Sequence, residues 1–163
     1  MTINKAMSRI VAGKGRAAKR AVVFGLLLFF LSIAVSFLGC ATISLYSETA
    51  YQQATSLKVD SLAIMDKATE PYAQHQGEVE ALRLKIDKAY EYAKGRPKNE
   101  DSTRQWEILK NPDRHLLGGF LERWRKDSTL SPAFVEEKKI QVGAAFDTIS
   151  GLESGKIKPS ELK

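Results

Sequence analysis

Few residues in this chain carry the chemistry of a reactive site. The 163 residues include one cysteine, Cys40, and two histidines, His75 and His115. A zinc site needs several nitrogen, sulfur or carboxylate ligands brought together, and no HExxH or CxxC spacing supplies them. No serine stands in a GxSxG turn, and Gly118-Gly119 lacks the spacing and the Lys-Ser/Thr pair of a phosphate-binding loop. The sequence therefore predicts no catalytic residue, no metal site and no cofactor.

Cys40 stands at the end of a long apolar run. Residues 21–38 carry no charge, and the first 20 residues hold six basic groups and no acid. A basic segment, an apolar core and a small-residue site are the three parts of a secretory signal. The basic flank stays on the cytoplasmic side, so the chain that follows it is expected to cross the membrane.

The residues Phe37-Leu38-Gly39-Cys40 resemble the lipobox of bacterial lipoproteins. In that family a small residue precedes a cysteine that is lipidated and then becomes the first residue of the mature chain. Gly39 and Cys40 match the pattern, whereas the family usually has Leu at the position of Phe37 and Ala or Ser at that of Leu38. The resemblance covers about residues 1–42, and it implies that Cys40 is a lipid attachment site carrying acyl chains such as palmitate.

The resemblance also bears on where the protein is located. Several acyl chains on one cysteine exceed the two signals that stable membrane anchoring needs. Ala41 follows the cysteine, and in this family the absence of Asp there implies sorting to the outer membrane, facing the periplasm, if the source has an outer membrane. The apolar run is also just long enough to span ~30 Å of hydrocarbon as a helix, so an uncleaved signal anchor is the alternative. Both interpretations place the remaining domain outside the cytoplasm.

The net positive charge belongs to the N-terminal segment. The whole chain has 25 basic and 19 acidic residues, and without the first 20 residues the two counts are equal. We therefore expect no nucleic-acid partner, because residues 40–163 are formally neutral. Since the chain has no second cysteine, the exported domain has no internal disulfide and must be held together by packing.

The rest of the sequence predicts an all-α fold. Strand-like alternation is absent, and five prolines divide the chain into helix-like segments. We expect helices at about 44–68 and 72–94, a third region with caps at Ser102 and Asn111 on either side of a break, and a last helix capped by Ser131. This pattern predicts a signal or transmembrane helix followed by a compact antiparallel bundle of about four helices, the third split.

The clearest periodicity lies in the second helical segment. Apolar residues recur there at alternating steps of three and four, which predicts a seam packed against another helix. His75 falls on this seam, and we interpret it as a residue at the edge of the core or as one that forms a hydrogen bond between helices. The pairs Arg83–Asp87 and Glu80–Arg83 have ion-pair spacing and indicate a solvated face. The seam comprises Tyr72, His75, Val79, Leu82, Ile86, Ala89 and Ala93.

The predicted organisation has three parts: a signal peptide or anchor at 1–39, a helical extracytoplasmic domain at 40–155, and a flexible tail at 156–163. The leading interpretation is a non-enzymatic, membrane-anchored envelope lipoprotein with a helical interaction domain. Its expected partners are the membrane, through the acyl chains, and an envelope protein or the cell wall. Arg123, Trp124 and Arg125 are the predicted partner surface, because aromatic and arginine residues are enriched at binding hot spots. A position in the core is the alternative for Trp124.

Three alternatives stay open at this stage. The domain could be a lipid- or small-molecule-binding bundle, with an apolar ligand between helices near Trp106 and Trp124. Aromatic residues at helical spacing are more often core, so a filled core would favour the interaction domain and a large cavity the ligand-binding bundle. The chain could also be a bitopic membrane protein with an uncleaved anchor. An enzyme would require polar side chains that converge in a cleft.

Overall fold

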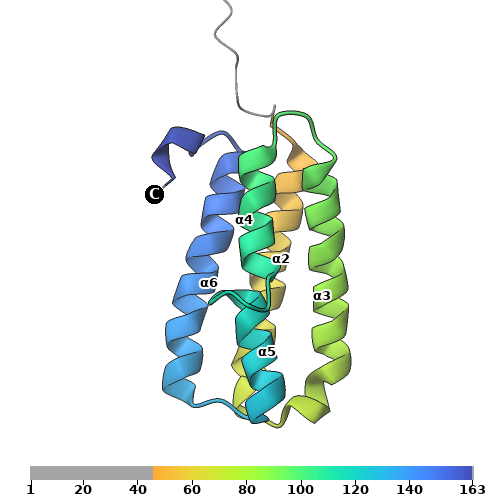
Figure 1. Ribbon diagram of the computed structural model, residues 1–163, viewed down its shortest axis with the longest axis vertical. Helices are drawn as coiled ribbons and strands as arrows, with labels where there is room; N and C mark the ends of the chain where they lie inside the picture. The colour runs from red at the N-terminus through yellow and green to blue at the C-terminus, as the bar shows by residue number, and fades with distance from the viewer. Residues whose placement is uncertain (1–45, 163) are drawn as a thin grey trace, which may run out of the picture. The chain divides into compact units, whose positions relative to one another are not determined.

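The computed structural model describes residues 46–162, and its regular structure there is entirely helical (Figure 1). Cys40 and the predicted signal segment lie outside the described residues. Residues 46–162 form five α-helices and no strand, which confirms the predicted all-α class for this part of the chain. The helices are α2 (Glu48–Asp66), α3 (Tyr72–Lys94), α4 (Glu100–Lys110), α5 (Leu117–Asp127) and α6 (Pro132–Glu153).

The helices form an antiparallel bundle in which α4 and α5 together occupy one position. In Figure 1, α2 descends, α3 ascends, α4 and α5 descend one after the other, and α6 ascends. Helix α2 packs against α3 and α6, and α4 packs against the same two helices. The predicted split of the third region is therefore present as two short helices. None of the helices in residues 46–162 combines the length and apolar character that a membrane crossing requires.

Local sequence explains where the long helices begin and end. Ser47 caps α2 by accepting a hydrogen bond from Ala50 N at 3.2 Å, so this helix begins at Glu48 and later than expected. The break expected between the first two helices is present, and Pro71 directly precedes α3. The predicted cap of α6 is confirmed, because Ser131 Oγ accepts a hydrogen bond from Phe134 N with a proline at the first helical position.

Both caps predicted in the third region are wrong. Ser102 lies inside α4, which begins two residues earlier, and its hydroxyl serves a buried carboxylate instead of the helix end. Asn111 ends α4 rather than starting α5, since a residue before proline avoids the helical region and its backbone is extended here. Its side chain accepts a hydrogen bond from Asp113 N at 2.8 Å, and α5 begins only at Leu117.

The glycine pair at the start of α5 permits a close backbone approach. A Cβ atom on Gly118 would collide with the carbonyl group of Lys110, and one on Gly119 would collide with the carbonyl group of Arg114. Only glycine therefore fits at these two positions without displacing the α4–α5 connection. The pair therefore places the start of α5 directly against the end of α4 and the connection that follows it.

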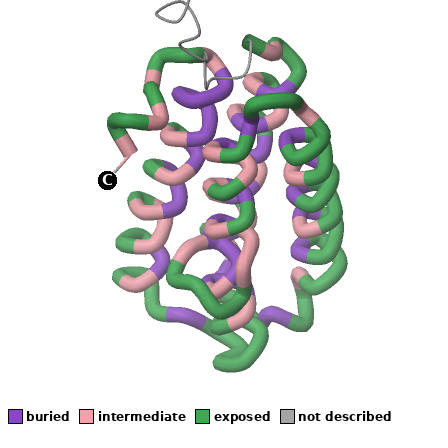
Figure 2. Tube along the Cα trace, turned by 45° about the horizontal axis from the view of Figure 1, so that its top comes forward, coloured by how far each residue is buried: buried purple, intermediate pink, exposed green. Residues whose placement is uncertain are grey.

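The core lies between the four columns of helix, where the buried stretches face one another (Figure 2). The seam predicted on α3 is confirmed for six of its residues, which are buried. The indole of Trp106 meets the ring of Phe146 edge-on at 5.8 Å between centroids. The indole of Trp124 meets Tyr72 in the same way at 5.4 Å. Edge-to-face contacts of this kind add to the stability gained by burial.

The predicted tail begins with contacts to α6. Ile157 N donates a hydrogen bond to the carbonyl of Gly151 at 3.0 Å, and the Ile157 side chain lies directly against that glycine. A short 3-10 turn, Pro159–Glu161, follows. The packed part of the chain therefore extends to Ile157, and the flexibility of the remaining tail stays a prediction.

Candidate functional site

The predicted partner surface on α5 contains one residue that is not on the surface. Trp124 is completely buried, and its Nε1 donates a hydrogen bond to the carbonyl of Glu70 at 2.9 Å. Trp124 lies three residues after Leu121 and four residues after Phe120, so it belongs to the apolar face by which α5 packs against the core. The prediction of Trp124 as a surface residue is therefore wrong.

Arg123 and Arg125, the two sequence neighbours of Trp124, are exposed. The guanidinium of Arg123 lies 4.4 Å from the centroid of the Phe134 ring, and its Nε donates to Asp127 at 3.2 Å. Arg125 donates to both carboxylate oxygens of Glu122, at 3.1 and 2.5 Å. This pairing lowers the pKa of Glu122 and raises the pKa of Arg125.

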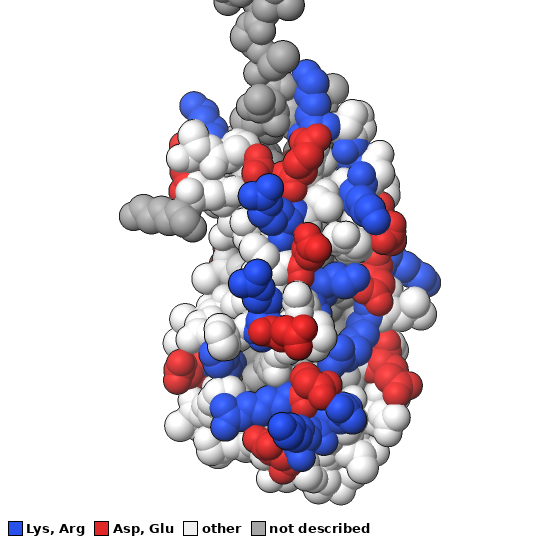
Figure 3. Space-filling view, in the orientation of Figure 1, with Lys and Arg blue, Asp and Glu red and all other residues white. Residues whose placement is uncertain are grey.

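Basic side chains gather around the lower end of α5 with acidic ones among them (Figure 3). Because Arg123 and Arg125 both engage a neighbouring carboxylate, a partner would have to exchange these exposed ion pairs for its own. Exposed pairs contribute little to stability, so such an exchange has a small cost. The surface suits a partner with mixed charge and an apolar group that can reach Phe134.

A buried polar cluster near the end of α6 was not predicted from the sequence. The side chain of Glu153 is 0% exposed, and it forms an ion pair with Arg96, whose side chain is 12% exposed. Its Oε1 also accepts hydrogen bonds from Ser102 Oγ at 2.5 Å and from Asn99 Nδ2 at 3.2 Å. Asn99 in turn donates to the carbonyl of Ala93 at 3.0 Å.

This cluster holds together three parts of the bundle: the α3–α4 loop, the first turn of α4 and the last residue of α6. Both oxygens of Glu153 are occupied by donors from the protein. A general base must have an oxygen that a substrate can reach in order to accept its proton. A carboxylate whose two oxygens already accept hydrogen bonds from the protein is poorly placed for that role. We interpret the cluster as a structural network that stabilises the packing of α4 and the α3–α4 loop against α6.

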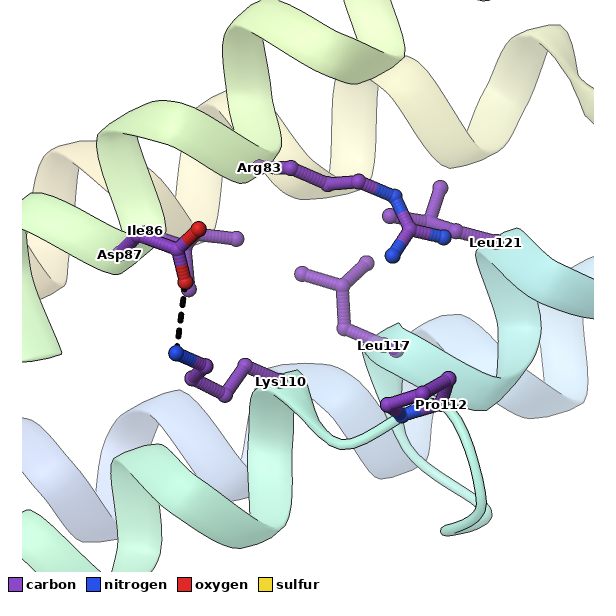
Figure 4. Close-up of a pocket in the computed structure, with 8 residues that line it drawn as sticks. Arg83, Ile86, Asp87, Lys110, Pro112, Leu117 and Leu121 are labelled. Atoms are coloured by element: carbon purple, nitrogen blue, oxygen red, sulfur yellow. Dashed lines mark ion pairs between the residues drawn. The ribbon is translucent and has the colours of Figure 1, made fainter.

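A pocket of about 280 Å³ lies where α3 faces the break between α4 and α5 (Figure 4). The carboxylate of Asp87 and Lys110 Nζ form an ion pair at 2.7 Å on one side of it. This pair replaces the predicted pairing of Asp87 with Arg83. Lys110 Nζ also lies 4.3 Å from the centroid of the Tyr90 ring. The lining residues are Arg83, Ile86, Asp87, Lys110, Pro112, Leu117, Gly118 and Leu121.

The two histidines lie apart. His75 is at the edge of the core, as predicted, with Nε2 2.6 Å from a carboxylate oxygen of Glu70 and its ring 5.8 Å from that of Trp124. His115 is exposed in the α4–α5 connection. Within residues 46–162, no group of three His, Cys, Asp or Glu side chains is arranged to hold a metal ion.

No family model, curated protein or solved structure matches this chain. The function therefore has to be inferred from its own residues.

Proposed function

We propose that this chain is a membrane-anchored envelope lipoprotein whose helical domain binds a protein or cell-wall partner. Acyl chains on Cys40 would hold it to the membrane with the helical domain outside the cytoplasm, and in a cell with an outer membrane it would face the periplasm. The observation that carries the proposal is Cys40 itself, directly after Gly39 at the end of the uncharged run and behind six basic residues.

The packing of the described domain supports binding rather than turnover. Its two tryptophans are buried among neighbouring side chains, which leaves little room beside either indole for an apolar ligand. This observation favours the interaction domain over an apolar ligand held near Trp106 and Trp124. Its buried carboxylate, Glu153, is saturated with protein donors. The exposed ion pairs and the Phe134 ring around α5 remain as groups that a partner can contact.

Intact-mass measurement of the protein extracted from membranes tests the anchor. We expect residues 1–39 to be absent and the mass of acyl chains to be present on the new N-terminus. Cys40→Ala should abolish both changes, and Cys40→Ser is a second variant that keeps a polar group of similar size. Recovery of the full-length wild-type chain with a free thiol would reject lipidation and support an uncleaved anchor.

Crosslinking in intact cells, followed by mass spectrometry, tests the partner surface. We expect a reproducible envelope partner that is lost when Arg123 and Arg125 are both replaced by Glu. Lys88→Glu, which makes the same kind of charge reversal at one exposed position of α3, is the control. Circular dichroism must show that all variants keep their helix content. Equal crosslinking by the double variant and the control would reject this surface, and a co-purifying small ligand inside the bundle would favour the ligand-binding alternative.

A further inference from the structure

We propose that the pocket between α3 and the α4–α5 connection binds a small monocarboxylate that carries a compact branched apolar group. This pocket is separate from the surface formed by Arg123 and Arg125. The inference does not rest on the membrane anchor or on the proposed partner.

The size and floor of the pocket define the apolar part of the ligand. Its volume of about 280 Å³ lies just below the ~300–1,000 Å³ that is usual for small-molecule sites, so the ligand is small. Ile86, Leu117 and Leu121 are almost completely buried beneath it. Figure 4 shows the Leu117 side chain pointing into the space that Arg83, Asp87 and Lys110 surround. A branched aliphatic group would bury its surface on this floor.

The charges on the rim define the polar part. Lys110 is held by Asp87, and Glu122 is engaged by Arg125 through two hydrogen bonds. Arg83 lies close enough to lower the pKa of Glu122 as a lesser cause, yet it forms no ion pair with a carboxylate of residues 46–162. Its guanidinium therefore keeps its hydrogen-bond donors for a ligand.

The geometry and sign of these groups favour a monoanion. A guanidinium matches a carboxylate through two parallel hydrogen bonds. The rim holds two cations, Arg83 and Lys110, against one carboxylate, Asp87, so its balance is one positive charge. Helix α5 begins at the pocket without a side-chain cap, and the positive end of its dipole acts in the same direction. A dianion would be repelled by Asp87, and a cation would be repelled by Arg83.

A titration of the full-length protein in detergent micelles, followed by saturation-transfer NMR, tests the site with 3-methylbutanoate. Ligands of so few atoms bind weakly, and we expect a dissociation constant of about 1 mM. The neutral isostere 3-methylbutanamide should bind at least tenfold more weakly. Micelles without protein correct for partitioning of the probe.

Three variants locate the binding in the structure. Arg83→Gln should weaken binding of 3-methylbutanoate at least tenfold, because it removes the charged donors and keeps most of the side chain. Asp87→Asn should bind the acid at least as tightly as the native chain, since it removes the carboxylate from the rim. Arg104→Gln, on an exposed position of α4 outside this pocket, should leave binding unchanged. Circular dichroism confirms that each variant is folded.

A carboxylate beside a branched group can come from a free acid or from the end of a peptide. N-acetyl-Gly-Leu with a free carboxylate, compared with the same peptide as its amide, separates these sources. Binding of either acid that is lost in Arg83→Gln supports the proposal and identifies the source. Equal binding of acid and amide, or full retention of binding in Arg83→Gln, would overturn it.

Discussion

Replacing Glu153 by Gln should destabilise the helical domain, because it removes the negative charge from a buried ionic network. The carboxylate is fully buried, and its partners are Arg96, Ser102 and Asn99. Glutamine has the same shape, but it brings an NH₂ group to a position surrounded by donors. One oxygen can still accept a hydrogen bond from Ser102 or Asn99, while the amide nitrogen then faces another donor.

The expected magnitude follows from the burial of the two charges. Removing one member of a buried ion pair costs ~3–5 kcal/mol. Because the Arg96 side chain is 12% exposed, water can partly solvate its guanidinium, and the lower end of that range, about 3 kcal/mol, applies. With an m value of about 1.5 kcal/mol/M, this loss lowers the urea midpoint by about 2 M.

Urea denaturation of residues 42–163, followed by circular dichroism and tryptophan fluorescence, measures this loss. Trp106 and Trp124 lie in different helices, so coincident transitions would also support two-state unfolding. Glu107→Gln, on an exposed position of α4, should change stability by less than ~0.5 kcal/mol. A loss for Glu153→Gln below ~1 kcal/mol would refute a buried ionic network.

A double variant separates the loss of the pair from the burial of its charges. Arg96→Met combined with Glu153→Met removes both charges and leaves apolar side chains in their place. Replacement of a buried pair by apolar residues is often nearly neutral, so the double variant should be more stable than Glu153→Gln. If it is instead less stable, the hydrogen bonds from Asn99 and Ser102 contribute more than the ion pair.

Three further changes have clear expected outcomes. Gly118→Ala should cost at least about 3 kcal/mol in urea denaturation because its Cβ collides with backbone, whereas Gly77→Ala, in open space on α3, should stabilise by ~0.5–1 kcal/mol. Leu82→Ala should cost ~2–5 kcal/mol if the buried seam packs as described, and a cost near zero would contradict it. Lys67→Met should raise the pKa of Glu78 toward its usual 4.5 in an NMR titration, since a hydrogen bond from that lysine is the main cause of its lowering. A lowered pKa in the native state means that this pair stabilises the fold above pH ~4.5 and that the contribution is lost as the pH falls; an unchanged pKa would contradict the assignment.

The fold class could be predicted because apolar periodicity and proline positions are local properties of the chain. The seam on α3 and the cap of α6 at Ser131 required only spacing and residue type. The caps at Ser102 and Asn111 could not be placed in this way. A Ser or Asn side chain has several possible partners, and the tertiary structure decides between them: Ser102 is used by Glu153 from a distant helix.

The candidate sites were harder to predict because they combine residues that are far apart in sequence. Glu153 did carry a local signal, since it lies four residues after Ile149 on the buried stripe of α6 and a carboxylate there needs partners. Its partners 51 to 57 residues away had no such signal. The basic neighbours of Trp124 favoured the surface and its spacing from Phe120 favoured the core, and the structure buries it completely.

The break in the third helical region links the fold to the proposed carboxylate pocket. Pro112 ends α4, and the two glycines let α5 begin against the end of that helix. The connection exposes a gap in one column of the bundle, and the gap faces the middle of α3, where Arg83 is located. A continuous helix would instead present side chains along this whole face to α3. Two of the residues that interrupt the helical pattern in the sequence, Pro112 and Gly118, therefore line the pocket, and its floor is formed by Ile86, Leu117 and Leu121.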